Sequence, residues 1–357
     1  MNLQLIKIKD HVHLGPFQLE CGEVLPEVTI AYEKVGNIET DQVILVCHAL
    51  TGDTHAVGDE ANPGWWDGLI GVGKYIDLQK YTVITMNVIG GCAGSTGPAS
   101  IDPCTRKEYG SRFPMVTIRD MVRVQHEALR KLGIDRLKAV IGGSMGGMMV
   151  LEWAVMYPGY MEKCIPIATG ATLSTMSMAY NEIGRQAILE DPEFRGGDYY
   201  PGKGPVKGLS IARMIGMVTY RTNPLFEQRF AQQNTQNTQA LVESYLHYQG
   251  KKLVNRFDAN TYLRFLDAMD HHDLGRGRGG LEEAVKNISA QVLTIGIKED
   301  IYFPVRQQRE FHQICQRAGI RSSYHEFSSD YGHDAFLVEY QLFGKQIQQF
   351  LDEEWNY

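Results

Sequence analysis

The sequence lacks the features of a membrane protein, a secreted protein or a small metal-binding module. No stretch of its 357 residues reaches the run of about 18 apolar residues that a membrane helix needs. Positions 1–10 alternate apolar and polar residues, without the apolar segment or cleavage site of a signal peptide. The six cysteines include no C-x-x-C pair, so neither a zinc ribbon nor a redox motif is indicated. We therefore expect a cytoplasmic protein with free thiols and no membrane association.

An excess of basic residues is also missing. The net charge is −7, so binding to nucleic acid is not expected. The run Gly275–Gly280 (Gly-Arg-Gly-Arg-Gly-Gly) is similar to an RNA-binding tract, but it is short and isolated in an acidic chain. We expect it to be a flexible seam between two parts of the fold.

One stretch combines a strand, a sharp turn and a helix around Ser144. An apolar run suited to a buried strand ends at Ile141, and helical periodicity begins at Met148. The Gly-Gly-Ser-Met-Gly between them is an instance of G-x-S-x-G, which holds a nucleophilic serine in a strained, exposed turn. Gly142 and Gly146 remove side chains that would collide across the turn. The alternative is a glycine-rich turn that only packs a helix on a sheet.

Strands alternate with helices on both sides of this turn. Such alternation predicts an α/β fold in which a mostly parallel sheet is covered by helices on both faces. The expected strands are Leu3–Ile8, Phe17–Glu20, Glu27–Glu33, Val43–Cys47, Tyr81–Asn87, Lys163–Ala168, Gln291–Gly296 and Ser323–Phe327; the expected helices are Thr117–Leu132, Val305–Ala318 and Ala335–Glu353.

The middle of the chain shows helical periodicity without strands. This segment is too long for a loop, and the α/β pattern returns after it. We therefore predict an inserted helical lid at 171–287 and a core formed by 1–170 and 288–357. The expected lid helices are Ser177–Leu189, Gly208–Tyr220, Phe226–Gln232, Thr238–Gly250 and Asn260–Met269.

A nucleophilic serine needs a base, which a carboxylate orients. In the α/β-hydrolase fold, the acid and then the histidine follow the serine along the chain. Asp300 follows the strand that ends at 296, and His333 follows the strand that ends at 327. These positions predict a Ser144–Asp300–His333 triad, with Glu299 as a competitor for the acid role.

An acyl-transfer intermediate needs two donors for its oxyanion. The backbone N–H of Met145, directly after the nucleophile, is one candidate. The N–H of Leu50, in the loop after strand 43–47, is the other. His48 and His55 lie in or near this loop, but no carboxylate or third histidine completes a convincing metal set, so no metal is expected.

Several further segments give the chain a specific resemblance. It resembles the homoserine O-acetyltransferase family of α/β-hydrolase-fold acyltransferases, which serves microbial methionine biosynthesis. The segments that carry the resemblance are His48–Gly52, Gly64–Gly68, Asn87–Pro98, Tyr109–Pro114, Gly142–Gly147, Asn181–Gln186 and Tyr331–Phe336.

The resemblance implies a ping-pong reaction. Ser144, deprotonated by His333, would take the acyl group of an acyl-CoA, and the hydroxyl of L-homoserine would then accept it. Acetyl-CoA would be a co-substrate, and no cofactor would be bound. The family also implies a homodimer formed through the lid.

The resemblance further implies four substrate contacts. Arg213 matches the arginine that binds the homoserine carboxylate, and Tyr220 matches a tyrosine seven residues later. Asp334 matches the acid that contacts the ammonium group, and Thr51 a contact in the oxyanion loop. Without the family, Arg213 reads as a lid-surface charge and Asp334 as a helix N-cap.

Other readings remain open at this point. The acid loop Lys298–Pro304 departs from the family pattern, and its Glu299 and Tyr302 could alter the acyl-donor channel. Relatives that transfer succinyl groups or acylate serine share these motifs. An esterase or thioesterase would use the same triad with water, and a scaffold without activity would use none of it.

Overall fold

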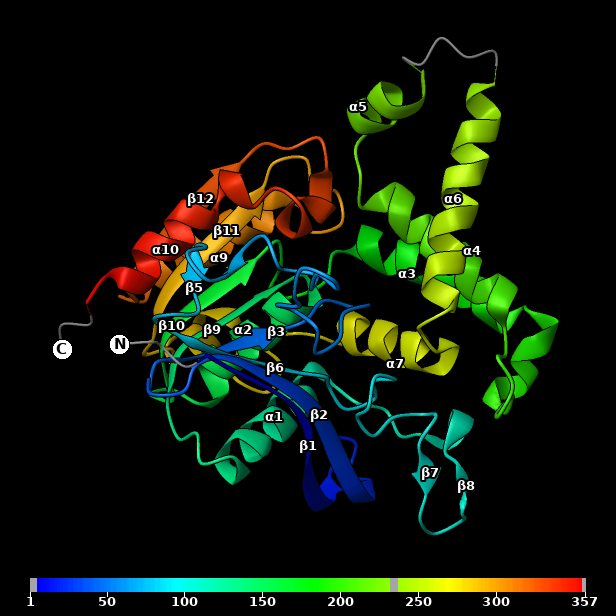
Figure 1. The fold of residues 1–357 in the computed structure, drawn as a ribbon, viewed down its shortest axis with the longest axis horizontal. Helices are drawn as coiled ribbons and strands as arrows, with labels where there is room; N and C mark the ends of the chain where they lie inside the picture. The colour runs from blue at the N-terminus through cyan, green and yellow to red at the C-terminus, as the bar shows by residue number, and fades with distance from the viewer. Residues whose placement is uncertain (1–4, 232–236, 355–357) are drawn as a thin grey trace.

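An eight-stranded sheet forms the centre of the computed structural model, which describes residues 5–231 and 237–354 (Figure 1). Its strands are hydrogen-bonded in the order β1-β2-β6-β3-β9-β10-β11-β12, and all neighbours from β6 to β12 are parallel. The predicted α/β class with a mostly parallel sheet is confirmed. The strands are β1 Leu5–Gln18, β2 Val24–Asn37, β3 Val43–Cys47, β6 Thr82–Met86, β9 Leu137–Gly143, β10 Met161–Ile167, β11 Gln291–Ile297 and β12 Ser322–Phe327; the short pairs are β4 Ile70–Gly71 with β5 Ile76–Asp77 and β7 Ile101–Asp102 with β8 Lys107–Glu108.

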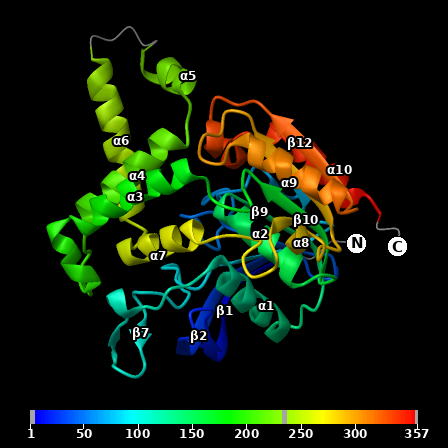
Figure 2. The same cartoon turned by 180° about the vertical axis from the view of Figure 1, so that it is seen from behind.

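Each face of the sheet carries its own hydrophobic core. Successive side chains of a strand point to opposite faces, so β3 sends Leu45 into one core and Ile44 and Val46 into the other. Helices α1, α2 and α9 cover the first face, and α10 covers the second; Figure 2 shows α2 beside β9 and β10. The helices of the core are α1 Ile118–Lys131, α2 Met145–Met156, α8 Leu281–Val285, α9 Val305–Arg317 and α10 Gly344–Asp352, with short 3₁₀ turns η1 Gly110–Arg112, η4 Gly332–Leu337 and η5 Tyr340–Leu342.

Helix α1 begins where the sequence predicts. Thr117 Oγ1 accepts a hydrogen bond from the N–H of Asp120 at 3.1 Å, and Asp120 Oδ2 accepts one from the N–H of Thr117 at 3.2 Å. This reciprocal capping box satisfies two N–H groups that have no partner within the helix. Gly133, with φ of 71°, follows the end of the helix.

The segment from Ala171 to Leu274, between β10 and α8, is helical and stands beside the sheet (Figure 1). Its start and end meet, because the N–H of Leu274 donates to the carbonyl of Ala171 at 2.9 Å and Thr172 forms a bridge with Asp273. The predicted helix Phe226–Gln232 is a short helix and a π turn, and Gln232 lies outside the described residues. The elements are α3 Thr175–Leu189, η2 Pro192–Gly197, α4 Val206–Thr219, α5 Asn223–Phe226, η3 Glu227–Ala231, α6 Thr238–Val254 and α7 Ala259–Asp270.

None of the helices within the described ranges 5–231 and 237–354 is long and apolar enough to cross a membrane.

Two predictions at the ends of the chain are wrong in detail. Two long strands replace the three short ones predicted near the amino terminus: Phe17 belongs to β1, which continues through register shifts around Gly15. Residues 3 and 4 of the first predicted strand lie outside the described residues.

The predicted closing helix Ala335–Glu353 is divided into η4, η5 and α10. The carbonyl of Phe336 accepts a hydrogen bond from Trp66 Nε1 at 2.9 Å, and the carbonyl of Leu337 accepts one from the hydroxyl of Tyr340. The helical ladder is interrupted in this stretch because Val338 and Phe343, with φ of −136° and −139°, leave the helical conformation.

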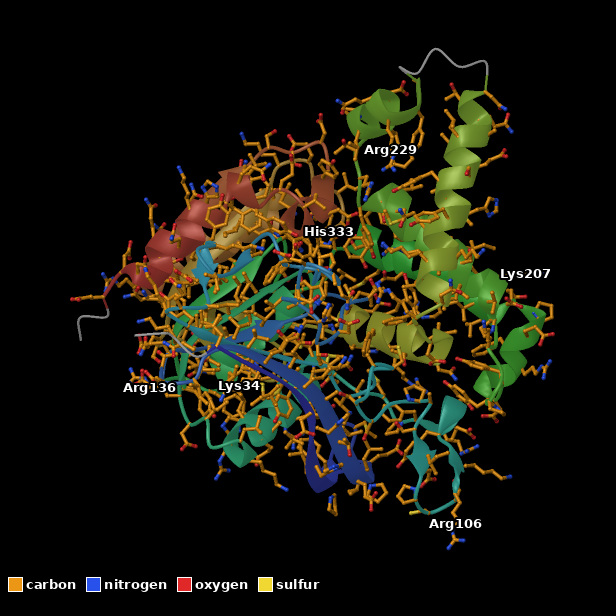
Figure 3. The ribbon with its side chains drawn as sticks, viewed as in Figure 1. Lys34, Arg106, Arg136, Lys207, Arg229 and His333 are labelled. Atoms are coloured by element: carbon orange, nitrogen blue, oxygen red, sulfur yellow. The ribbon has the colours of Figure 1, made fainter. Side chains whose placement is uncertain are left out.

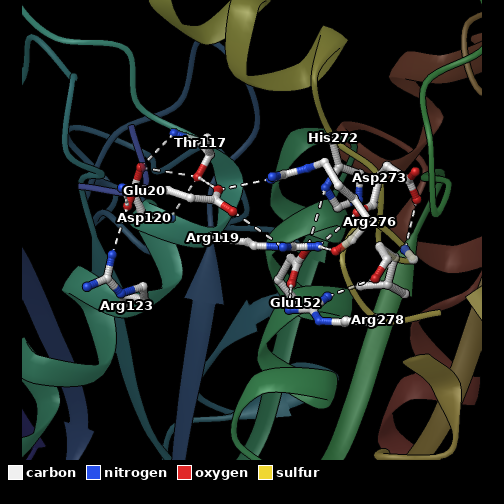
Figure 4. Close-up of polar contacts among 12 residues, drawn as sticks. Glu20, Thr117, Arg119, Asp120, Arg123, Glu152, His272, Asp273, Arg276 and Arg278 are labelled. Carbon is white, nitrogen blue, oxygen red and sulfur yellow. Dashed lines mark hydrogen bonds and ion pairs between the residues drawn. The ribbon is translucent and has the colours of Figure 1, made fainter. Parts of the chain in front are cut away.

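The run Gly275–Gly280 is held in place rather than loose (Figure 4). Arg276 donates to the carboxylate of Glu20 at 2.9 Å, and Arg278 donates to that of Glu152 at 2.7 Å. Glu152 is fully buried on α2, the helix that follows Ser144. The expectation of a flexible seam is therefore wrong, because both arginines are engaged in ion pairs with the core.

Candidate active site

The structure brings Ser144, Asp300 and His333 together at the carboxyl ends of β9, β11 and β12. His333 Nδ1 lies 2.6 Å from Asp300 Oδ2, and Nε2 lies 2.9 Å from Ser144 Oγ. Because the carboxylate accepts a hydrogen bond from the Nδ1–H group, Nε2 carries no proton and can accept the hydrogen bond of the serine hydroxyl. All three side chains are buried, and Figure 3 places His333 where the sheet meets the helical segment.

The backbone of Ser144 has the strain that the motif predicts. Its φ is 58° and its ψ is −126°, a conformation that non-glycine residues seldom adopt. A Cβ at Gly142 would lie 2.6 Å from the carbonyl oxygen of Gly146, and one at Gly146 would lie 2.1 Å from that of Cys47. The predicted collision across the turn is confirmed for Gly142, whereas Gly146 avoids a collision with the end of β3.

The two carboxylates of the acid loop have different partners. Asp300 Oδ1 accepts hydrogen bonds from the N–H groups of Tyr302 and Phe303, each at 2.8 Å, which leaves Oδ2 for the histidine. Glu299 points to another loop, where it accepts hydrogen bonds from the hydroxyl of Ser328 and the N–H of Ser329. The geometry therefore favours Asp300 over Glu299 as the partner of His333.

Two backbone N–H groups beside Ser144 have no acceptor among the described residues. Met145 is the first residue of α2, and Leu50 lies in the loop after β3; neither N–H is a donor in the hydrogen bonds of the described chain. Free N–H groups at this place are what an oxyanion site requires.

A cavity of about 240 Å³ opens onto Ser144 and His333. The four residues that the sequence predicts as substrate contacts line it: Thr51, Arg213, Tyr220 and Asp334. Glu299 and Tyr302, the residues of the acid loop that could alter the acyl-donor channel, are not part of the lining of this cavity. The remaining lining residues are Ala49, Leu50, Met217, Arg221, Gln249, Lys252, Phe336, Leu337 and Val338.

Arg213 is a partly buried guanidinium without an anionic partner. It projects from α4 into the cavity, and within the described residues it forms no hydrogen bond or ion pair. A surface charge would face solvent, so the alternative reading of Arg213 does not match its position. An arginine that lines a cavity with all its donors free is suited to bind a carboxylate.

Asp334 has a partner that sequence reasoning missed. Its Oδ2 accepts a hydrogen bond from Arg221 Nε at 3.1 Å, and both side chains are largely buried. It lies inside η4 and caps no helix, so the alternative N-cap reading is wrong. Arg221 directly follows Tyr220, but its partner lies 113 residues away, so no local pattern could reveal the pair.

Two tyrosines surround the His333 ring. The ring centroids of Tyr220 and Tyr302 lie 5.3 and 5.6 Å from that of His333. Burial raises the pKa of both phenols well above the usual value, so both stay neutral. The Tyr302 hydroxyl donates to Asn181 Oδ1 at 2.6 Å, which ties the acid loop to α3.

The two histidines considered as metal ligands are occupied by other contacts. Nδ1 of His48 lies 2.8 Å from the carbonyl of Ala49, and Nε2 of His55 lies 2.9 Å from the carbonyl of Asn62. Across residues 5–231 and 237–354, no group of three or more His, Cys, Asp or Glu side chains is arranged to hold a metal ion.

Known proteins share this architecture. A family model described as the alpha/beta hydrolase fold matches residues 42–340. The homoserine O-acetyltransferase of Symbiobacterium thermophilum is 49% identical over 354 residues, which cover 95% of this chain and 92% of that protein. The crystal structure of homoserine O-acetyltransferase from Bacillus anthracis is similar with a TM-score of 0.91 at 31% identity, covering 98% of each chain. That of esterase E22 has a TM-score of 0.89 at 28% identity, covering 97% of this chain and 100% of that one.

Fold and site together define an enzyme of the α/β-hydrolase fold. The identity to the Symbiobacterium protein extends over nearly the whole of both chains. The chain belongs to the homoserine O-acetyltransferase family, and the resemblance found in the sequence is confirmed.

Proposed function

We propose that this protein transfers an acetyl group from acetyl-CoA to the side-chain hydroxyl of L-homoserine through an acyl-serine. The observation that carries the proposal is one cavity lined by Ser144, by the free guanidinium of Arg213 and by the carboxylate of Asp334. The serine and its histidine support acyl transfer. Opposite charges beside them support recognition of a zwitterionic amino acid as the acceptor.

In the first half-reaction, His333 Nε2 removes the proton of Ser144 Oγ as this oxygen attacks the thioester carbonyl. The N–H groups of Leu50 and Met145 stabilise the oxyanion that forms. The carbon–sulfur bond then breaks, and the imidazolium gives its proton to the departing thiolate of CoA. Asp300 holds the histidine in the tautomer that these proton transfers require, and it stabilises the positive charge of the imidazolium.

In the second half-reaction, the neutral His333 removes the proton of the homoserine hydroxyl, which attacks the acetyl-serine carbonyl. The same two N–H groups bind the second oxyanion. The bond to Ser144 Oγ then breaks and the oxygen regains a proton from His333, which releases O-acetylhomoserine. Because CoA is released before homoserine reacts with the acetyl-serine, the mechanism is ping-pong.

Four cavity residues are proposed to bind the acceptor. Arg213 takes the carboxylate through two parallel N–H donors, and Asp334 takes the ammonium group. Tyr220 and Thr51 complete the site with neutral hydroxyls. The cavity is lined by three cationic side chains, Arg213, Arg221 and Lys252, and by one carboxylate, Asp334. This excess of positive charge favours an anionic group in the cavity.

We also propose a cytoplasmic homodimer. All six cysteines are free, which suits a reducing compartment. Helices α3, α4 and α6 expose apolar side chains that a partner would cover. These side chains are Met176, Ile183, Ile211, Val218 and Tyr248.

The structural likeness to esterase E22 favours one second candidate, hydrolysis of an ester or thioester with water as acceptor. An esterase has no need for a free arginine in its cavity, which is the reason we prefer the transferase. A succinyl donor or a serine acceptor would use the same machinery.

The first test measures CoA thiol release by the purified protein with acetyl-CoA or succinyl-CoA, each with and without L-homoserine. We expect steady release that requires homoserine and is faster with acetyl-CoA. Preference for succinyl-CoA would keep the mechanism and change the donor. Steady release that ignores homoserine would support the hydrolase instead.

Replacing Arg213 by alanine is expected to impair use of homoserine while sparing acyl-enzyme formation. Loss of a bidentate contact to a carboxylate costs about 2 kcal/mol or more, so kcat/KM for homoserine should fall about 30-fold. The rapid first release of CoA should stay near the wild-type rate. The matched control is Lys207→Ala, which removes a positive charge from an exposed position on the same helix. An unchanged KM for homoserine would show that Arg213 does not bind this substrate.

A further inference from the structure

A short piece of the helical segment is joined to the loop that carries His333. Tyr220 directly follows α4 as its C-cap, and its carbonyl accepts a hydrogen bond from the N–H of Asp334 at 3.3 Å. The N–H of Thr222 donates to the carbonyl of Asp330 at 3.4 Å, and the Thr222 hydroxyl donates to the same oxygen. Backbone groups on both sides of His333 are therefore bound to residues 220–222.

A glycine allows the two chains to approach so closely. Gly332 has a φ of 56°, and a Cβ there would lie 2.9 Å from the carbonyl oxygen of Tyr220. Any side chain at this position would push residues 220–222 away from the histidine loop.

Arg221, at the centre of this piece, is fixed on three sides. Its Nε–H donates to Asp334 Oδ2 at 3.1 Å, and its Cζ lies 5.8 Å from the ring centroids of both Tyr245 and Tyr331. Only 13% of the arginine side chain and 11% of the aspartate side chain are exposed. An arginine held between two rings presents its donors in one fixed direction.

This contact leaves half of the Asp334 carboxylate available. No donor among the described residues lies within hydrogen-bond distance of Oδ1, and Asp334 lines the cavity beside Ser144. Burial is the main cause of the raised pKa of Tyr220, Arg213 lowers this pKa and Asp334 raises it, so both charges act on one ring. Arg213, Tyr220 and Asp334 line the same cavity, and within the described residues Arg213 and Asp334 do not pair with each other.

We propose that Arg221 is a positioning residue for the amino-acid acceptor: it holds Asp334 by Oδ2 so that Oδ1 faces the ammonium group of the substrate. The inference rests on the proposed function, because it assumes an acceptor with an ammonium group. Arg221 itself does not touch the acceptor. It fixes the direction of the one carboxylate in a cavity whose other charges would repel a cation.

The test compares two acceptors, L-homoserine and 4-hydroxybutanoate, which has the same hydroxyl and carboxylate but no ammonium group. In Arg221→Met we expect the KM for homoserine to rise about tenfold or more. The kcat/KM for 4-hydroxybutanoate and the rate of the first CoA release should stay within about threefold of wild type. In Arg221→Lys the KM for homoserine should return close to the wild-type value. Lys207→Met, which removes an exposed charge from α4, should leave the kinetic constants for both acceptors unchanged.

Loss of activity with both acceptors to the same extent would show that Arg221 only supports the histidine loop, and would overturn the inference. So would an unchanged KM for homoserine in a variant that folds. If thermal unfolding shows that Arg221→Met does not fold, Arg221→Gln is measured in its place: a KM raised for homoserine alone supports the inference, and any other pattern overturns it. A wild-type enzyme whose CoA release ignores homoserine would instead overturn the proposed function.

Discussion

Ser144→Ala is expected to abolish both CoA release and formation of O-acetylhomoserine, with a loss of at least about 10⁴-fold in kcat. The variant keeps the oxyanion donors and the histidine, but it has no oxygen on which to carry the acetyl group between the two substrates. A mechanism in which homoserine attacks acetyl-CoA directly would retain much of the rate. The measurement is thiol release together with chromatographic detection of the product.

Two controls make this result specific. Ser323→Ala removes a hydroxyl from an exposed position on β12 and should leave turnover unchanged. A reactive-serine probe should label the wild type and Ser323→Ala but not Ser144→Ala. Labelling that persists in Ser144→Ala would mean that another serine is the nucleophile.

Asp300→Asn is expected to lower kcat about 10³- to 10⁴-fold although it changes only one atom. The backbone N–H groups of Tyr302 and Phe303 both donate to Oδ1, so the amide oxygen of the asparagine will occupy that place. Its NH₂ group then faces His333 Nδ1 and donates to it. This forces the proton onto Nε2, which can no longer accept the hydrogen bond of Ser144.

The matched control is Glu299→Gln in the same loop. Glu299 contacts Ser328 and Ser329 and not the histidine, so turnover should stay within about threefold of wild type. Both variants are measured by CoA release under saturating substrates. If Glu299→Gln lost activity as severely as Asp300→Asn, the assignment of the acid would be wrong.

Local patterns predicted the core of this fold well because each signal is contained in a few residues. The capping box at Thr117, the continuous apolar run of β3 and the G-x-S-x-G turn need no knowledge of distant partners. Asp300 and His333 were found because parallel strands bring their carboxyl ends to one edge.

The errors arose where contacts between residues far apart in the sequence determine the local structure. The helix predicted to close the chain is interrupted in the stretch where Trp66, 270 residues away from Phe336, donates to the carbonyl of that residue. The glycine–arginine run is fixed because Glu20 and Glu152 pair with its arginines. Likewise, Arg221 and Lys252 reach the cavity only through the way α4 and α6 pack, which the sequence pattern does not contain.

The two ends of the helical segment lie side by side at Ala171 and Leu274. Changes in the helical segment can therefore occur separately from changes in the sheet. Strands β10 and β11 are already neighbours in the sheet, so the core passes from one to the other whatever lies between them. A stretch whose ends lie side by side can be lengthened or exchanged without displacing the strands that it joins. The helices over the cavity can therefore diverge as one unit and change what the enzyme accepts, while the serine, the histidine and the acid remain with the sheet.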